Sequence, residues 1–376
     1  MLIAGIFWLF FLAVAVQCCY AFYFFRHIGD LPPATELPVN ARRHVSIIIC
    51  ARNEAANLRK NLPAILAQRY TNEAGKPLYD VIVVDDASTD DTALVLAQLK
   101  SVYDNLEVVT IQQDAERDLK GKKFALSKGV EQSAHDWLLF TDADCMPAGD
   151  RWLEQMVAPL AAGKEIVAGY GGYYHRAGLL NAFIRWETMH TFLQYSTYIL
   201  KGKPYMAVGR NMACLKYIVL KAQRSELWNV VPSGDDDLLV TAAGTADNMI
   251  VVAQPSAFTW SEAKGTWRTW AQQKRRHLST GKYYNDNIKL LLGFYGAAHT
   301  DAWLCFFILL FTAYWKAALA IMAVRCIIYW RNWARTAAII NEGKLIIFFP
   351  LLDLGWMIYN LAFLPYITWK NKNNWT

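Results

Sequence analysis

The stretch that decides the fold is Asp136-Trp-Leu-Leu-Phe-Thr-Asp-Ala-Asp-Cys-Met-Pro147. Its apolar run, residues 137–140, has the length of a strand and leads to Asp142 and Asp144, with one alanine between them. Successive strand side chains point to opposite faces, so carboxylates at i and i+2 share one face. Two ionised carboxylates held close together repel each other unless a cation lies between them. Their oxygen ligands suit Mg²⁺ or Mn²⁺ bound to a nucleotide diphosphate, although Asp-x-Asp alone is more often an acidic surface turn.

Further runs of apolar, β-branched residues surround this strand in the sequence. Residues 45–50 and 81–84 have the pattern of strands buried on both faces, residues 106–111 are predicted to form a third strand, and residues 166–174 resemble one more strand. Helical patterns separate these runs, so we predict an α/β fold with a mostly parallel sheet and right-handed crossovers. No Gly-x-Gly-x-x-Gly or Gly-Lys-Ser/Thr loop is present in the sequence, which argues against dinucleotide or P-loop chemistry.

The carboxyl ends of the strands carry polar residues. Ligands of parallel sheets bind beyond these ends, where Asn53, Asp86 and Asp142 all fall. The sequence therefore predicts one binding site assembled from three separate strand ends.

The N-terminal segment is almost wholly apolar. Residues 2–25 contain no charge and are long enough to cross a bilayer as a helix. A cleaved signal peptide would have a basic start and a shorter apolar core. Arg26, Arg42 and Arg43 follow the segment, and this bias places the next domain in the cytoplasm and the N-terminus outside.

The C-terminal third is again apolar. Residues 292–315, 316–330 and 345–369 read as three spans, with a basic cytoplasmic loop over 331–344. Arg325 and Asp353 are costly in lipid, and we hypothesise that they pair with each other. The alternative is that Arg325 extends to the membrane interface.

Composition limits the function. The formal net charge of +6 fits an anionic membrane surface or a phosphorylated substrate better than a nucleic acid. The seven cysteines show no zinc-type spacing, and the apolar strand contexts of Cys50 and Cys145 indicate reduced, buried thiols at these two positions. We expect five segments, in chain order: a transmembrane helix over 1–25, a linker over 26–43, a cytoplasmic catalytic domain over 44–264, a basic amphipathic interfacial segment over 265–290 and transmembrane helices over 291–370.

Six short motifs occur in one order between Val45 and Lys282. They are Val45 to Glu54, Val-Asp-Asp-x-Ser-x-Asp-x-Thr over 84–92, Gly121-Lys-x-x-Ala-Leu126, Asp142-Ala-Asp144, Gly234-Asp-Asp236 and Gln273-x-x-Arg276. Together they resemble the family 2 glycosyltransferases, the inverting, membrane-attached branch related to cellulose, chitin and hyaluronan synthases and to ceramide glucosyltransferase. The resemblance implies a GT-A nucleotide-binding domain and a sugar-nucleotide donor, usually UDP-linked.

The resemblance also assigns roles around the donor. Nucleoside contacts would come from Ala51, Asn53, Glu54 and Asp86. Lys122 would be a point charge near the nucleotide, Asp144 the direct metal ligand, and Asp142 a support for the metal or the sugar. Without the resemblance, Asp86 is equally a helix cap and Lys122 a solvated helix lysine.

An inverting transfer needs a base for the acceptor hydroxyl. By the family pattern Asp236 is the base and Asp235 its neighbour; if the alignment shifts by one residue, Asp237 is the base instead. Without the resemblance, this acidic run would be interpreted as the N-terminus of a helix. Gln273 and Arg276 resemble the Gln-x-x-Arg-Trp element that holds the leaving diphosphate. His277 replaces the usual tryptophan, which weakens the case for synthesis of a long polymer.

We therefore expect an inverting, metal-dependent glycosyltransferase at the cytoplasmic face of a bacterial inner membrane. Its partners would be a nucleotide sugar, a lipid or lipid-linked acceptor and the membrane, with no nucleic acid. Processive polysaccharide synthesis is the enzymatic alternative. The non-catalytic alternative is a protein that has lost its activity and only binds a nucleotide sugar.

Overall fold

The structure, a computed structural model, describes residues 1–113, 119, 121–231 and 234–368, of which 365–368 are described by backbone alone. They form two compact units. The helical unit contains Met1–Asp30, His175–Lys201 and the described residues 264–368, and the sheet unit contains the described residues of 31–174 and 202–263. Helix α6 (Leu179–Leu200) therefore belongs to the helical unit, although segments of the sheet unit flank it in the sequence.

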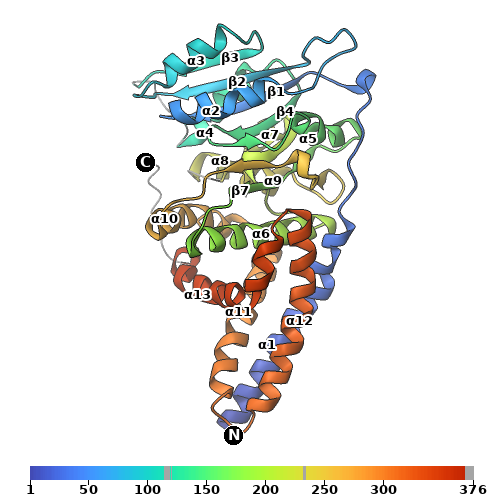
Figure 1. The fold of residues 1–376 in the computed structure, drawn as a ribbon, viewed down its shortest axis with the longest axis vertical. Coiled ribbons are helices and arrows are strands. Elements are labelled where there is room, and N and C mark those ends of the chain that lie inside the picture. The colour runs from blue at the N-terminus through green and yellow to red at the C-terminus, as the bar shows by residue number, and fades with distance from the viewer. Residues whose placement is uncertain (114–118, 120, 232–233, 369–376) are drawn as a thin grey trace. The chain divides into compact units, whose positions relative to one another are not determined.

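The sheet unit is built on a seven-stranded sheet of order β3-β2-β1-β4-β8-β6-β9 (Figure 1). Strands β1 to β4 are mutually parallel, and β8 is antiparallel to both β4 and β6. This confirms the predicted mostly parallel α/β sheet. The strand bounds are β1 Val45–Ala51, β2 Tyr79–Asp86, β3 Leu106–Ile111, β4 Trp137–Asp142, β6 Ile166–Ala168, β8 Met212–Leu215 and β9 Met249–Val251.

Helices cover both faces of this sheet. Ile47 and Val83 point into a core shared with α2, α3 and α5, whereas Ile82 and Val84 pack against α4. A β-carbon on Gly129 of α4 would lie 2.7 Å from Ile48 Cγ2, so only glycine allows α4 this close to β1. The helix bounds are α2 Ala55–Leu66, α3 Thr92–Lys100, α4 Lys122–Gln132, α5 Trp152–Ala161, α7 Lys216–Gln223, α8 Glu226–Val230 and α9 Asp235–Ala243.

The expected single strand over 166–174 is wrong. The chain breaks after β6, and β7 (Gly171–Tyr173) joins a separate sheet of order β5-β10-β7. The break lies at Gly169, where an added β-carbon would lie 2.4 Å from the Asn211 side chain, so the close approach of that side chain excludes any larger residue. The other strands of the small sheet are β5 Met146–Pro147 and β10 Thr259–Ser261.

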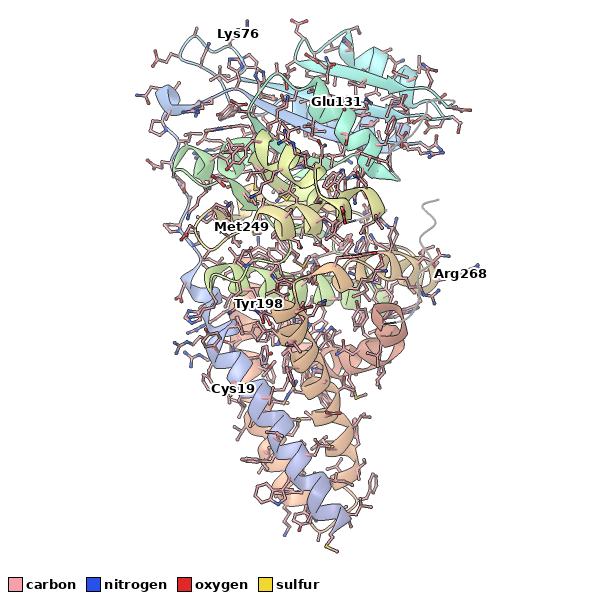
Figure 2. The ribbon with its side chains drawn as sticks, turned by 180° about the vertical axis from the view of Figure 1, so that it is seen from behind. Cys19, Lys76, Glu131, Tyr198, Met249 and Arg268 are labelled. Atoms are coloured by element: carbon pink, nitrogen blue, oxygen red, sulfur yellow. The ribbon has the colours of Figure 1, made fainter. Side chains whose placement is uncertain are left out.

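In the helical unit, α1 (Leu2–Tyr23) lies beside α11 (Asp286–Leu309) and α12 (Trp315–Ile339), as Figure 1 shows. Figure 2 labels Cys19 on α1 and Tyr198 on α6. The unit also contains α10 Trp267–Leu278, α13 Phe349–Thr368 and the short 3₁₀ helices η1 Phe25–Asp30, η5 Gly281–Tyr283 and η6 Gly343–Phe348.

Within the described residues, three helical segments are long and apolar enough to cross a membrane: Leu2–Asp30, Asp286–Leu309 and Gly343–Leu364. They correspond to the N-terminal span and to the first and third C-terminal spans that the sequence predicted. The middle one falls on α12, which is not among these three segments. The expected end of the third span, at residue 369, lies outside the described residues.

The expected loop over 331–344 is helical through Ile339. Basic residues do not break a helix, and the chain turns only where Asn341 adopts φ +60°. Asn332 and Trp333 are buried, and the Trp333 ring contacts Trp186 of α6 at a centroid distance of 4.2 Å. Packing within the helical unit therefore extends α12 past the point where the hydropathy pattern ends.

The hypothesised pair between Arg325 and Asp353 is confirmed. Arg325 Nη1 donates to Asp353 Oδ2 at 2.7 Å, and both side chains are buried. Arg325 Nη2 also donates to Gln17 Oε1 at 2.9 Å, and Trp303 Nε1 donates to Asp353 Oδ2 at 2.9 Å. The ion pair thus joins α1, α11, α12 and α13, and it excludes an Arg325 that extends to the membrane interface.

Candidate active site

Two loops at the carboxyl end of the sheet are joined by hydrogen bonds. Asn53, after β1, and Ala87, after β2, both have positive φ, 57° and 56°, which non-glycine residues seldom adopt. Asn53 N donates to Ser88 Oγ at 2.9 Å, and Thr89 N donates to Asn53 Oδ1 at 2.8 Å. These bonds hold a backbone conformation that is costly by itself, which is typical of a binding loop.

The four residues predicted to contact the nucleoside lie on or beside these loops. Ala51 is the last residue of β1, and Glu54 caps α2, where its Oε2 accepts a bond from Asn57 Nδ2. Asp86 is the last residue of β2 and is 1% exposed. Ser88 N donates to Asp85 Oδ1 at 3.2 Å, and Thr92 N donates to Asp90 Oδ1 at 3.0 Å. The N-cap residue of α3 is Asp91, so Asp86 does not occupy the capping position considered for it.

The acidic turn follows β4 directly. Asp142 ends the strand opposite Cys50 of β1, and Cys145 N donates to Asp142 O at 3.0 Å, which closes the turn. One potential ligand atom each from Asp142, Asp144 and Cys145 lies within 4.8 Å of the others. Burial, and then the Asp144 carboxylate, raise the pKa of the Cys145 thiol well above its usual range. A neutral thiol is a poor ligand for a hard ion, so the two carboxylates fit Mg²⁺ or Mn²⁺ as the principal ligands.

Lys122 connects this turn to the acidic helix α9. Its ammonium forms an ion pair with Asp142, and it lines a cavity together with Cys50, Thr141 and Asp235. Burial by itself would lower the lysine pKa, but Asp142 and Asp235 raise it well above its usual value. Lys122 is therefore a fixed cation beside both acidic groups rather than a solvated helix lysine.

Asp236 is held by two backbone donors. Gly209 N donates to Asp236 Oδ2 at 2.7 Å, and Asp237 N donates to Asp236 Oδ1 at 3.0 Å. Burial, followed by the Asp235 carboxylate, raises the pKa of Asp236 to about 6, while the two N–H groups and Lys122 oppose this rise. Such a carboxylate is ionised at neutral pH and close to the pKa at which a general base works best.

Gln273 and Arg276 lie in the helical unit, on α10. The inner face of α10 is anchored by Trp270, whose ring contacts Phe183 at a centroid distance of 5.6 Å, and by an ion pair of Lys274 with Glu187 of α6. Arg276 is exposed, as is Arg268, which points away from the helix in Figure 2. The structure therefore brings the predicted acids and Lys122 together in the sheet unit, and Gln273 and Arg276 together on one helix of the helical unit.

Two residues of the sheet unit were missed by sequence reasoning. Gly209 lies in 3₁₀ helix η3 (Gly209–Asn211), inside a segment that the sequence marks only as a loop before a strand or helix. Lys123 follows the predicted Lys122 but points elsewhere, to the backbone of α8. A glycine before a polar run was the available signal for Gly209, and for Lys123 the sequence carried none.

The sequence profile described as Glycosyl transferase family 2 matches residues 46–219. Residues 46–219 form a glycosyltransferase family 2 domain. This confirms the resemblance drawn from the motifs. The match contains the donor loops, Lys122 and the acidic turn, and it ends before α9 and α10.

Curated proteins are similar to about a third of this chain. Glycosyltransferase AglE of Haloferax volcanii is 38% identical over 126 residues, which are 33% of this chain and 38% of AglE. Poly-beta-1,6-N-acetyl-D-glucosamine synthase of Staphylococcus aureus is 27% identical over 124 residues, which are 33% of this chain and 27% of the synthase. The chain thus aligns with well under half the length of these relatives.

A solved structure extends the similarity of fold beyond the family 2 domain. Mannosyltransferase PcManGT from Pyrobaculum calidifontis, in complex with GDP-Man and Mn²⁺, superposes with a TM-score of 0.58 at 17% identity. The superposition covers 96% of this chain and 99% of PcManGT. At this identity the similarity supports the fold alone, and it agrees with the predicted GT-A-like architecture.

Proposed function

We propose that the protein transfers a sugar from a nucleotide sugar, with inversion, to a lipid or lipid-linked acceptor at the cytoplasmic face of a bacterial inner membrane. The observation that carries the proposal is the placement of Lys122, which is paired with Asp142 and lines one cavity with Asp235. Two acidic groups far apart in the sequence therefore border one site in the sheet unit. The family 2 domain supplies the reaction class.

The donor would occupy the loops after β1 and β2. Glu54 and Asp86 accept hydrogen bonds from the ribose and base, and Asn53 fixes the loop that they line. Asp144 and Asp142 would hold Mg²⁺ or Mn²⁺; PcManGT, which has a similar fold, was solved with GDP-Man and Mn²⁺. When bound, the ion stabilises negative charge on the diphosphate. Lys122 adds a second positive charge, and we assign the leaving diphosphate to Gln273 and Arg276.

The chemical step requires one proton acceptor. The acceptor oxygen forms a bond to the anomeric carbon on the face opposite the diphosphate, whose bond breaks and which leaves with the electron pair. The hydroxyl proton passes to the Asp236 carboxylate, a contribution of roughly 10²–10⁴-fold to the rate. The two N–H bonds to Asp236 and its raised pKa favour it over Asp237 as the base.

The membrane acceptor rests on the three candidate spans of the helical unit and on the basic residues that follow the first of them. Processive polymer synthesis is the second candidate, because 124 residues of this chain are 27% identical to poly-beta-1,6-N-acetyl-D-glucosamine synthase. Product length separates the two. A single added sugar supports transfer to a lipid, and a ladder of oligosaccharides supports the synthase.

The test is a screen of UDP- and GDP-sugars with the purified full chain, Mn²⁺ and a membrane-lipid extract, read by nucleoside diphosphate release and by mass spectrometry of the products. Asp236→Asn should abolish release, whereas Asp247→Asn, which changes an exposed carboxylate of the same unit, should not. Absence of transfer from every donor would refute the proposed activity. Release undiminished by Asp236→Asn would refute the assignment of the base.

A further inference from the structure

Lys123 is a fully buried charged residue beside the proposed site, with a relative exposure of 0%. Its Nζ donates to Trp228 O at 3.1 Å and to Val231 O, and it lies 4.9 Å from the centroid of the Trp228 ring. An ammonium has three donors, and here two of them are used on backbone carbonyls while the aromatic face accepts the cation. The side chain is therefore fixed in one position.

This placement is costly for a lysine. Burial lowers the pKa of Lys123 to about 8, although Asp235 and Asp236 oppose the shift. The residue also lies in the first turn of α4, where the helix dipole disfavours a cation. Residues that break such local rules are concentrated at functional or strained positions, where they are compensated by specific partners.

The partners of Lys123 precede the proposed base in the sequence. Trp228 lies in α8 and Val231 is its C-cap; Gly234, with φ +75°, is the N-cap of α9, whose first residues are Asp235 and Asp236. Lys122, one residue earlier on α4, pairs with Asp142. In the first turn of α4, Lys122 thus binds the acidic turn after β4, and Lys123 binds the C-terminal end of α8.

We propose that Lys123 is a positioning residue for Asp236: by holding the carbonyls of Trp228 and Val231 against the first turn of α4, it sets where α9 begins and so where the base lies relative to the donor. The inference rests on the proposed function, because it assigns Lys123 a role in the same reaction. Lys123 touches no reacting atom and acts through the backbone and through its charge.

The charge has a consequence of its own. The groups that surround the Asp236 carboxylate are Asp235 and Asp237 on its own helix, Lys122 and Lys123 on α4, and the N–H of Gly209 on η3. A cation near an acid favours the ionised form. Removing Lys123 should therefore raise the pH at which the base becomes active, and a merely structural role would leave that pH unchanged.

The kinetic experiment compares Lys123→Met with Lys128→Met in the full chain. Lys128 is a partly exposed lysine of the same helix, paired with Glu131, which Figure 2 labels. A misplacement of about 1 Å costs roughly 10²-fold, so we expect Lys123→Met to lower kcat about 10- to 100-fold. The KM for the donor should stay within about threefold, and the acid limb of the pH–rate profile should move to higher pH. Unchanged kcat, or a rise in donor KM alone, would overturn the proposal.

Hydrogen–deuterium exchange separates this inference from the proposed activity. In Lys123→Met, but not in Lys128→Met, the amides of α9 should exchange faster than in the wild type, whether or not any donor is turned over. Exchange in α9 that matches the wild type would sink the inference even if the enzyme is active. If Lys123→Met does not fold, Lys123→Gln must show the same two changes in smaller measure, and wild-type values for that variant also refute it.

Discussion

Removing the carboxylate of Asp235 should make the proposed base work at lower pH. Asp235 precedes Asp236 in the first turn of α9, and its negative charge is the second cause, after burial, of the raised pKa of Asp236. Asp235→Asn keeps the size of the side chain and removes the charge. The pKa of Asp236 should then fall from about 6 toward its ordinary value of 3.8.

The size of the effect follows from the two causes. Since Asp235 is the smaller of the two, we expect its loss to lower the pKa of Asp236 by about one pH unit, or ~1.4 kcal/mol. With a pKa of about 6, the ionised fraction of Asp236 is about 0.9 at pH 7 and about 0.1 at pH 5. With a pKa of about 5, the fraction at pH 5 is about one half. Relative to its own plateau, the variant should be about fivefold more active than the wild type at pH 5.

The assay is the pH–rate profile of nucleoside diphosphate release at saturating donor and metal, from pH 4.5 to 8. Each profile is normalised to its own plateau, because Asp235→Asn is also expected to lower the plateau. Asp247→Asn serves as the matched control, since Asp247 is an exposed acid of the same unit. Its profile should coincide with that of the wild type.

Superimposable acid limbs for wild type and Asp235→Asn would refute the coupling between the two carboxylates. A wild-type rate that is flat from pH 5 to 7 would refute the raised pKa of Asp236 itself, because a carboxyl at its ordinary pKa of 3.8 is almost wholly ionised across that range.

Three further predictions concern the ion pair, the loop and the metal. Arg325→Met or Asp353→Leu alone should destabilise the protein by about 3–5 kcal/mol, because each single change leaves a buried charge unpaired, and the double variant should lose much less. Thermal unfolding in detergent measures these losses. Losses of stability that add up in the double variant would contradict the pair. Gly209→Ala should lower kcat about tenfold, since the added β-carbon would lie 3.2 Å from the carboxylate of the proposed base. The control Gly149→Ala, which has open space around it, should leave kcat unchanged. Equal kcat values for the two variants would argue against the contact. Asp144→Ala should raise the Mn²⁺ concentration needed for half-maximal rate by at least about tenfold. This concentration is measured by titrating Mn²⁺ into the protein after its metal has been removed with a chelator. An unchanged titration curve would show that Asp144 is not a metal ligand.

Sequence reasoning predicted the strands near the site well because their apolar runs are continuous. The run at 45–50 became Val45–Ala51, and the run at 106–111 was reproduced without change. In β1 all residues but Cys50 are buried, so nearly every side chain is apolar and the pattern is clear. The edge strand β3 is partly exposed and includes Glu107 and Thr110, but its other four residues are apolar. The predicted strand over 166–174 failed because its short apolar runs do not tell which sheet each half joins.

The contacts of the candidate site also fall into local ones, which the sequence predicted, and long-range ones, which it did not. The proximity of Asp142 and Asp144 was predictable because Asp142 is the last residue of β4 and only one residue separates the two acids. The contact of Asp236 with Gly209 joins residues 27 positions apart, and that of Lys123 with Val231 joins residues 108 positions apart. No local pattern determines such contacts, because they depend on how α8 and α9 pack against α4.

Charges that the local structure disfavours were the most informative residues in this chain. Arg325 and Asp353 lie within apolar helices, and the cost of a charge there made their pairing one of two arrangements that the sequence allowed. Lys123 is equally out of place, at the start of a buried helix, but its partners are backbone carbonyls, which no sequence pattern marks. A misplaced charge therefore shows that a compensating partner exists, and the sequence identifies that partner only when it is another charge. The first turn of α4 carries two adjacent lysines: Lys122 pairs with Asp142, and Lys123 binds backbone carbonyls. Substitutions of these two residues should therefore separate the placement of the base from the binding of the donor.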